Sequence, residues 1–220
     1  MKLHTVFITF NRLELTKRAI TTYLETIDVP YSMVVVDNAS SDGTRKWLTE
    51  MLFEDVILEH VLLERNHYPG YACNRGWMLA PEDATHLQRA DNDMAFLPGW
   101  CRHVERQFRH PKVGQVGLRT AQEEFNVRSN VGGNCVILRK LWDLGLRYDE
   151  RPWPKFPPGM SEDSYFSPAV QALGYRWERV RNPCLESLAS GDWDDPYYAK
   201  SFGDRRIKRG TLLTERRRRA

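Results

Sequence analysis

The sequence predicts an α/β domain with a central, mostly parallel sheet flanked by helices. Short apolar runs alternate with longer segments of helical period through the first half of the chain, and three of these runs end in polar residues. Strands that are joined by helices pair in parallel, because the crossover returns the chain to the same edge of the sheet. A chain of 220 residues that is 41% hydrophobic and 28% charged can bury a sizeable core, which excludes a disordered chain.

The expected elements follow the periodicity of apolar residues. Apolar or aromatic residues recur every four positions from Leu15 to Ile27, which is helical spacing. The run Met33 to Val36 is apolar throughout, as expected for a strand that is buried on both faces. In chain order we expect strands over 6–8, 33–36, 61–63, 85–90, 113–118, 134–138 and 175–180, and helices over 13–26, around 47–51, over 71–79 and over 161–173.

The charge is distributed unevenly along the chain. The whole sequence carries +3, but residues 200–220 hold nine Lys or Arg against only Asp204 and Glu215, so the rest of the chain is net negative. We interpret residues 204–220 as a basic, solvated tail. The alternative is a contact with a polyanion, either nucleic acid or an acidic membrane surface.

Several protein classes are excluded by composition. No run approaches the roughly 18 apolar residues that a membrane span requires. The N-terminus passes directly into a polar-punctuated strand, which does not resemble a secretory signal. The four cysteines form no CxxC pair, so neither a zinc site nor a disulfide framework is expected. We therefore expect a cytoplasmic protein, with peripheral attachment to a membrane through the basic tail as the alternative.

Polar side chains gather where three of the predicted strands end. Thr9, Asn11 and Arg12 follow the first strand, Asp37 ends the second, and Asp91 and Asp93 end the fourth. Turn chemistry alone explains Asp or Asn at any single strand end. Three such ends at one edge of a parallel sheet favour a ligand crevice, because ligands of these sheets bind beyond the carboxyl ends of the strands.

The segment Asp91-Asn92-Asp93 is the most informative of these clusters. If it is extended, both carboxylates lie on one side and Asn92 lies on the other. Two converging carboxylates repel each other, and a cation resolves that repulsion. Oxygen ligands suit Mg²⁺ or Mn²⁺ rather than zinc, and such ions usually complete their coordination with phosphate oxygens.

The order and spacing of several motifs resemble family 2 glycosyltransferases of the GT-A fold. The matching segments are VFITFNR, MVVVDNASSDGT, ERNHYPGYACNRGW, RADNDMAFLPGW and SEDSYFSPAVQALGYRW, which together cover about residues 3–181. The resemblance implies a Rossmann-like, nucleotide-diphospho-sugar transferase domain over 1–203. It further implies a nucleotide-binding half over 1–98 and an acceptor and catalytic half over 99–203.

The resemblance also implies roles in binding the donor. Thr9, Arg12 and Asp37 match positions that hold the base and ribose, and we count Asn11 and Asn92 with them. Asn66 and Asn74 match a stretch that braces the donor pocket. Asp91 and Asp93 match the family's DxD motif, whose last Asp chelates the metal that bridges the donor diphosphate. Arg12 or Arg89 would help this metal to stabilise the leaving group.

One departure from the family concerns the metal shell. Many relatives supply a His after the last core strand, and this chain has no His beyond His110. Glu186 lies near the expected place and is our candidate for the missing ligand. Asp192, Asp194, Asp195 or a water molecule are the alternatives.

The pair Glu162-Asp163 matches the family's ED pair, in which the Asp removes a proton from the attacking acceptor hydroxyl. That assignment makes Asp163 the catalytic base, with Glu162 beside it, and it implies inversion at the anomeric carbon. Ser161-Glu162-Asp163 is also an ordinary helix start, where carboxylates are favoured by the helix dipole. The upstream pair of aspartates favours the catalytic interpretation.

The sequence therefore predicts an inverting, metal-dependent glycosyltransferase of hexosyltransferase type. Its donor is a nucleoside-diphosphate sugar, and its acceptor is a hydroxyl group of a saccharide, a lipid-linked glycan or modified DNA. Two alternatives stay open at this point. One is a nucleotidyltransferase, although no glycine-rich loop follows the first strand. The other is a nucleic-acid-binding protein that uses the basic tail.

Overall fold

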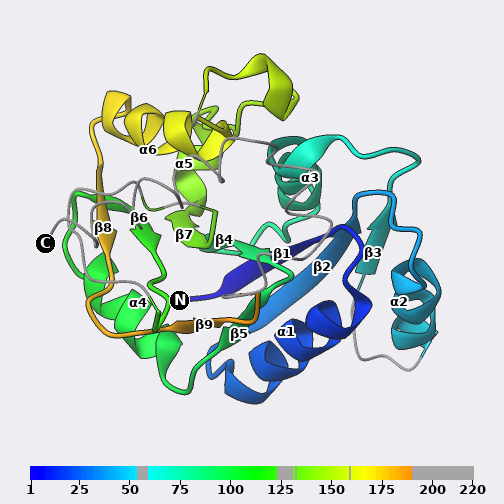
Figure 1. The fold of residues 1–220 in the computed structure, drawn as a ribbon. Coiled ribbons are helices and arrows are strands. Elements are labelled where there is room, and N and C mark those ends of the chain that lie inside the picture. Colours follow the sequence, from blue (N-terminus) through cyan, green and yellow to red (C-terminus); the bar gives the residue numbers. More distant parts are fainter. Residues whose placement is uncertain (54–58, 123–130, 132, 159, 190–220) are drawn as a thin grey trace, which may run out of the picture.

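The computed structural model describes residues 1–53, 59–122, 131, 133–158 and 160–189. A twisted central sheet has helices on both faces, and a small two-stranded sheet lies below it (Figure 1). In chain order the elements are β1 (Leu3–Thr9), α1 (Leu13–Thr26), β2 (Tyr31–Asp37), α2 (Thr44–Phe53), β3 (Glu59–Leu62), α3 (Tyr68–Trp77), β4 (His86–Asp91), β5 (Met94–Phe96), α4 (Trp100–Phe108), β6 (Val113–Gly117), β7 (Cys135–Leu138), α5 (Arg139–Asp143), a 3₁₀ turn η1 (Trp153–Lys155), α6 (Glu162–Ala172), β8 (Arg176–Arg179) and β9 (Leu185–Ser187).

The strands of the large sheet are ordered β3-β2-β1-β4-β7-β6-β8. β1 lies between β2 and β4 and is parallel to both, and β2 is parallel to β3. Only β7, among these strands, is antiparallel to its two neighbours, β4 and β6. The expectation of a mostly parallel α/β sheet is therefore confirmed, and the reversed direction of β7 is a feature that the sequence did not predict.

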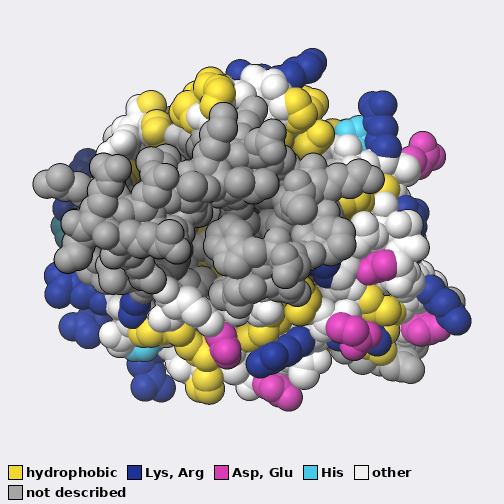
Figure 2. All heavy atoms as spheres, viewed as in Figure 1, with side chains coloured by type: hydrophobic (Ala, Val, Ile, Leu, Met, Phe, Trp, Pro, Cys, Tyr) yellow, Lys and Arg dark blue, Asp and Glu magenta, His cyan; other side chains and the backbone are white. Residues whose placement is uncertain are grey.

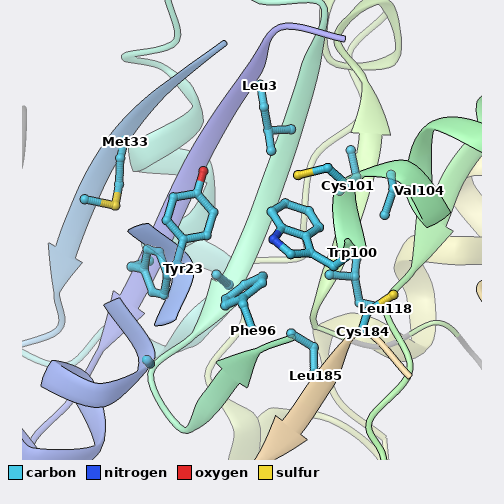
Figure 3. Close-up of a cluster of buried hydrophobic side chains, with 14 of the residues drawn as sticks. Leu3, Tyr23, Met33, Phe96, Trp100, Cys101, Val104, Leu118, Cys184 and Leu185 are labelled. Carbon is cyan, nitrogen blue, oxygen red and sulfur yellow. The ribbon is translucent and has the colours of Figure 1, made fainter. Parts of the chain in front are cut away.

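The core forms two layers, one on each face of the sheet. Leu3 and Phe7 of β1 pack with α1 and α4, whereas Val6 and Ile8 of the same strand belong to the cluster that includes α3, α5 and α6. This alternation follows from the period of two residues along a strand. Figure 3 shows the first layer, in which Tyr23, Phe96 and Trp100 lie together beneath the sheet; the Tyr23 and Phe96 rings are 5.2 Å apart.

Helix α4 covers the edge of this layer and is amphipathic. Trp100, Cys101 and Val104 are buried, whereas Arg102 and Arg106 are exposed to solvent. Figure 2 shows Lys and Arg side chains gathered at the lower left, over the position of α4 in Figure 1. The helix thus follows the common pattern of an apolar stripe facing the core and charged residues facing water.

Gly76 allows helix α3 to approach the centre of the sheet. A Cβ atom at this position would lie 2.5 Å from both γ-carbons of Val6. Gly76→Ala is therefore expected to lower the free energy of unfolding by about 1–3 kcal/mol, the usual cost of overpacking a core. Urea denaturation measures this change. The double variant with Val6→Ala should be less destabilised than the sum of the two single substitutions. Additive effects would contradict a steric clash between the two side chains.

The predicted elements are present, with bounds shifted by up to three residues. The strand expected over 6–8 extends from Leu3 to Thr9, and the helix expected over 71–79 begins at Tyr68 and ends at Trp77. Five elements were not predicted, namely β5, α4, α5, η1 and β9. No helix in the described part of the chain combines the length and apolar character needed to cross a membrane. The basic tail 204–220 and the last part of the expected domain lie outside the described residues.

Candidate functional site

The polar ends of three neighbouring strands meet at one edge of the sheet, as the sequence predicted. In the register of the sheet Thr9 of β1 lies beside Asp37 of β2, and Ile8 lies beside Asp91 of β4. The order β2-β1-β4 thus brings the segments after these strands together, although they are separated by tens of residues in the chain. This edge is the place where ligands of such sheets bind.

Asp37 organises the first part of this edge. Its side chain is fully buried, and the Thr9 hydroxyl donates a hydrogen bond to Oδ1 at 3.1 Å. The backbone N–H of Ser40 donates to Oδ2 at 3.0 Å, and the Arg45 guanidinium lies 3.7 Å from the same oxygen. Both carboxylate oxygens therefore have partners within the protein. Asp37 fixes the loop that follows β2 rather than projecting from it.

The turn between β1 and α1 has an unusual backbone. Asn11 and Arg12 both adopt left-handed conformations, with φ of 54° and 64°. Each such residue costs free energy and persists only when its surroundings hold it. The Ser40 hydroxyl accepts from the Asn11 backbone N–H at 2.7 Å, and the Asn92 side-chain amide donates to the Asn11 carbonyl at 3.0 Å. A second bond joins Asn92 to the Thr16 hydroxyl at 2.9 Å. Asn92 thus braces this turn from the end of β4.

The segment Asp91-Asn92-Asp93 is not extended throughout, which corrects the expectation from alternation. β4 ends at Asp91, and Asn92 and Asp93 form a turn. A turn does not preserve the alternation of a strand, so the three side chains take separate partners. Asp93 Oδ2 accepts from the Arg12 guanidinium at 3.1 Å, and both side chains are about nine-tenths buried.

Asp91 has different partners from Asp93. Its Oδ1 accepts from Arg89 Nε at 3.2 Å, and its Oδ2 accepts from the Asn134 side-chain amide at 3.0 Å. The Asn134 Oδ1 in turn accepts from the Asp91 backbone N–H at 2.9 Å. Asn134 directly precedes β7, and its role was not foreseen from the sequence. No local pattern marks it, because its position depends on the reversed direction of β7.

Arg89 lies at the centre of a cluster of carboxylates. Its Nη1 donates to Glu162 Oε1 at 3.0 Å and to Asp163 Oδ1 at 2.9 Å, in addition to the contact with Asp91. Burial disfavours the charged guanidinium, but the three carboxylates outweigh this effect and raise the pKa of Arg89 well above its usual value. Arg89 was one of two candidates to stabilise the leaving group. In the structure its guanidinium lies between the end of β4 and the start of α6.

The two carboxylates at the start of α6 differ in environment. Glu162 is buried, and its second oxygen, Oε2, accepts from the Trp153 indole N–H at 2.7 Å. The Asp163 side chain retains 23% exposure. Burial raises the pKa of Asp163 to about 7, against the opposing effect of Arg89 and in the same direction as the charges of Glu162 and Asp91. Asp163 thus titrates near neutral pH, where a general base works best.

The start of α6 is also a regular helix cap. Ser161 and Ser164 form a reciprocal capping box through their side chains and backbone N–H groups. The cap and the carboxylate cluster coexist, because Glu162 and Asp163 occupy the first turn, where carboxylates are favoured. The structure therefore confirms the helix start, and the catalytic interpretation of Asp163 stays a prediction.

Asn66 and Asn74 hold the surrounding segments in place. The Asn66 side chain accepts from the backbone N–H of Tyr68 at 2.8 Å, where Tyr68 has a left-handed φ of 67°. Asn74 is buried and donates to the Tyr148 carbonyl and to Glu150 Oε1, both at 2.9 Å. The Asn74 bonds fasten α3 to the chain that leads to η1. That Asn66 and Asn74 brace a donor pocket stays a prediction.

Glu186 lies in β9, which pairs with β5 so that Glu186 is opposite Ala95. The backbone N–H of Leu188 donates to the carbonyl of Asp93 at 2.8 Å, so β9 runs beside the segment that follows Asp93. Within the described residues, however, no group of three or more His, Cys, Asp or Glu is arranged to hold a metal ion. Glu186 therefore remains a predicted ligand, and Asp192, Asp194 and Asp195 lie outside the described ranges.

Comparison with known proteins identifies the family. Residues 5–155 match the family model for glycosyl transferase family 2. A curated relative, the uncharacterized glycosyltransferase YwdF of Bacillus subtilis strain 168, is 25% identical over 214 residues, which are 95% of this chain and 71% of the relative.

Solved structures share the fold. The mannosyltransferase PcManGT from Pyrobaculum calidifontis, in complex with GDP-Man and Mn²⁺, aligns with a TM-score of 0.70 and 17% identity over 87% of this chain and 58% of that chain. S. aureus TarS in complex with UDP-GlcNAc aligns with a TM-score of 0.64 and 14% identity over 87% of this chain and 61% of that chain. This chain thus spans less than two thirds of either solved chain, and the likeness at these identities shows the fold alone.

These findings favour a glycosyltransferase over the nucleotidyltransferase and the nucleic-acid-binding protein that the sequence left open. The family model covers more than half of the chain. Its match, residues 5–155, includes β2 and β4 and most of β1, and it ends before α6. The chain belongs to glycosyl transferase family 2 and has the GT-A fold.

Proposed function

We propose that this chain is an inverting, metal-dependent enzyme that transfers a sugar from a nucleoside-diphosphate sugar to a hydroxyl group of a saccharide or lipid-linked glycan. The observation that carries the proposal is the position of Asp163. It is partly exposed, it titrates near neutral pH, and Arg89 joins it to the strand end that holds Asp91. A base and a donor-side carboxylate are thereby held at one edge of one sheet.

In this proposal the donor nucleotide binds over the ends of β1 and β2. Thr9 and Asp37 shape this surface, and Asn11 and Arg12 form the turn beside it. Two structural neighbours support a donor of this class, because PcManGT was solved in complex with GDP-Man and TarS in complex with UDP-GlcNAc.

The residues at the end of β4 fit a divalent ion that binds together with the donor. Asp91 and Asp93 supply carboxylate oxygens, the ligands that Mg²⁺ and Mn²⁺ prefer. The described residues provide no cage of three such ligands, and ions held by one or two carboxylates normally take their remaining ligands from substrate phosphates and water. Asp91 and Asp93 would hold the ion, with Glu186 as the predicted third ligand. The ion would supply positive charge to the departing diphosphate.

Asp163 carries the chemical step. Its carboxylate accepts the proton of the acceptor hydroxyl as the acceptor oxygen forms a bond to the anomeric carbon of the sugar. The bond from that carbon to the phosphate oxygen breaks, and the electron pair leaves with the nucleoside diphosphate. Attack opposite to the leaving group inverts the anomeric configuration. Glu162 is fixed by Arg89 and Trp153 through its two oxygens, so it supports Asp163 rather than exchanging protons itself.

A thermal-shift screen tests this function directly. The panel contains nucleoside diphosphates and nucleotide sugars, each with Mn²⁺ and with a chelator. A ligand that binds only the folded state raises the unfolding temperature by mass action. One base and one sugar should raise this temperature more than the others, and only with the metal. No shift with any donor would contradict the proposal.

Asp37→Ala tests the nucleotide-binding part of the edge. The substitution leaves the Thr9 hydroxyl and the Ser40 N–H without their common partner, which loosens the loop that follows β2. We expect the affinity for the nucleoside diphosphate to fall by about 1–3 kcal/mol, the usual scale for a lost charged hydrogen bond. Isothermal titration calorimetry measures the loss. Unchanged affinity would show that this loop does not contact the nucleotide.

A further inference from the structure

Arg89 is a buried charged residue in the centre of the sheet. Its side chain is 4% exposed, and it belongs to a central strand whose neighbours Leu87 and Ala90 are fully buried. Burying a guanidinium costs several kcal/mol unless its donors are satisfied. The contacts of such a residue therefore indicate a role other than stabilising its own strand.

The contacts of Arg89 join two parts of the site. Asp91 comes from the end of its own strand, whereas Glu162 and Asp163 come from the first turn of α6, more than seventy residues later. The planar fork of a guanidinium can bond to several carboxylates in fixed directions, which the single ammonium of Lys cannot do. Arg89 thus fixes the direction of the α6 carboxylates relative to the end of β4.

The surroundings leave the guanidinium little freedom. The Tyr148 ring lies beneath it, with 5.0 Å from the guanidinium carbon to the ring centroid, and Tyr148 is stacked on Phe166 at 3.8 Å. A Cβ atom at Gly133 would lie 2.7 Å from an Arg89 Nη atom and 2.8 Å from Asp91 Oδ2. The Arg89 guanidinium is therefore held on one face by the stacked rings of Tyr148 and Phe166 and at its side by the backbone at Gly133.

The charge balance of the cluster gives Arg89 a second effect. Three carboxylates surround one guanidinium, so removing Arg89 takes away the positive charge that they share and leaves their mutual repulsion. Repulsion between carboxylates favours protonation of one of them, and Asp163 already titrates close to neutral pH. A carboxyl group that carries a proton cannot accept another, so its charge matters for its use as a base.

We propose that Arg89 is the positioning residue of this site: it orients the Asp163 carboxylate and favours the negatively charged form of that carboxylate. The inference rests on the proposed function, because it gives Asp163 the role of the base. Arg89 itself touches no reacting atom in this account and acts through Asp163. Among the described residues, the charged and titratable groups that interact electrostatically with Asp163 include Arg89 and Asp91 of β4, Glu162 of α6, Tyr148 before η1, Cys135 of β7 and Cys73 of α3.

Two substitutions separate aiming from charge. Arg89→Gln removes the charge and the fork, whereas Arg89→Lys keeps the charge and loses the fork. In Arg89→Gln, the acid limb of the pH profile of kcat/KM should move up by about one to three pH units, the usual effect of an opposite charge at this distance. The kcat at pH 7 should therefore fall about 10–10³-fold and recover as the pH is raised. In Arg89→Lys the acid limb should stay near that of the wild type, while kcat falls about tenfold.

Controls distinguish these effects from a general loss of structure. Arg139→Gln removes a more exposed ion pair, with Asp143, at the opposite end of the strands, and it should leave the pH profile unchanged. Circular dichroism should show native secondary structure in both Arg89 variants. A parallel fall in kcat at every pH in Arg89→Gln would overturn the proposal, as would an Arg89→Lys enzyme that equals the wild type.

A readout without turnover keeps this inference separate from the proposed function. The ¹³C signal of the Asp163 carboxyl, assigned with Asp163→Asn, titrates with pH in the folded protein. Its midpoint should be higher in Arg89→Gln than in the wild type. If the wild type transfers no sugar from any donor, the proposed function fails, but a raised midpoint still shows that Arg89 holds Asp163 charged. If the titration midpoint of Asp163 in Arg89→Gln equals that of the wild type, the inference about Arg89 is wrong, whatever sugar the enzyme transfers.

Discussion

Asp163→Asn is expected to lower kcat about 10²–10⁴-fold, the typical contribution of a general base, while the affinity for the donor nucleotide stays close to that of the wild type. The amide has nearly the shape of the carboxylate and can still accept the bond from Arg89, but it cannot take up a proton. Steady-state transfer assays and calorimetry with UDP or GDP measure the two quantities. Asp143→Asn is the matched control, because this exposed carboxylate lies on α5 at the opposite end of the strands.

The stability of this variant provides a second check. Burial raises the pKa of Asp163 above its unfolded value, so the folded state binds the proton more tightly. The stabilisation by that proton is complete below the unfolded pKa and is lost as the pH rises through about 7. Asp163→Asn has no such proton to lose, so its unfolding temperature should rise relative to the wild type between pH 5 and pH 8. A variant that loses kcat and stability together would indicate damage to the helix start instead.

Asp93→Ala should abolish the dependence of donor binding on the metal. Asp93 is the buried carboxylate that follows β4, and it is paired with Arg12 beside the proposed diphosphate. Without Asp93, one of the proposed carboxylate ligands of the ion is missing. The Arg12 guanidinium also loses its ion pair with Asp93. Calorimetric titration of UDP or GDP should then give the same affinity with Mn²⁺ as with a chelator.

The control for this experiment is Asp83→Ala, which removes an exposed carboxylate that pairs with Lys2 near the start of the sheet. It should retain the full difference between Mn²⁺ and chelator. Binding by Asp93→Ala that is as strong as in the wild type, and still requires the metal, would remove Asp93 from the metal site and leave Asp91 or Glu186 to hold the ion.

The sequence predicted the parts of this fold that depend on local pattern. Apolar runs such as Met33 to Val36 became buried strands, and the four-residue spacing around Tyr23 became α1. The meeting of Thr9, Asp37 and Asp91 at one edge was also predictable, because parallel strands place their carboxyl ends together. These inferences need only the period of the sequence and the handedness of the crossovers.

The rest of the site depends on contacts between distant segments, which no local pattern encodes. The turn at Asn92 and Asp93 overrides the alternation of the strand, because Asn92 bonds to the β1–α1 turn instead. The strands β5 and β9 have three residues each, and neither is long enough to show a period. The sequence suggested Arg89 only as a cation near the leaving group, and the packing of α6 shows which carboxylates it meets.

The reversed direction of β7 has a consequence for how such enzymes diversify. Because β7 runs against its neighbours, its first residue emerges at the same edge as the last residues of β1 and β4, and Asn134 reaches Asp91 from there. The stretch that connects β6 to β7 therefore starts and ends at this side of the sheet without crossing it. A change in its length would leave the strand registers intact and alter what surrounds Asp91. Under the proposed function, acceptor choice can therefore change here without a change in the proposed nucleotide site.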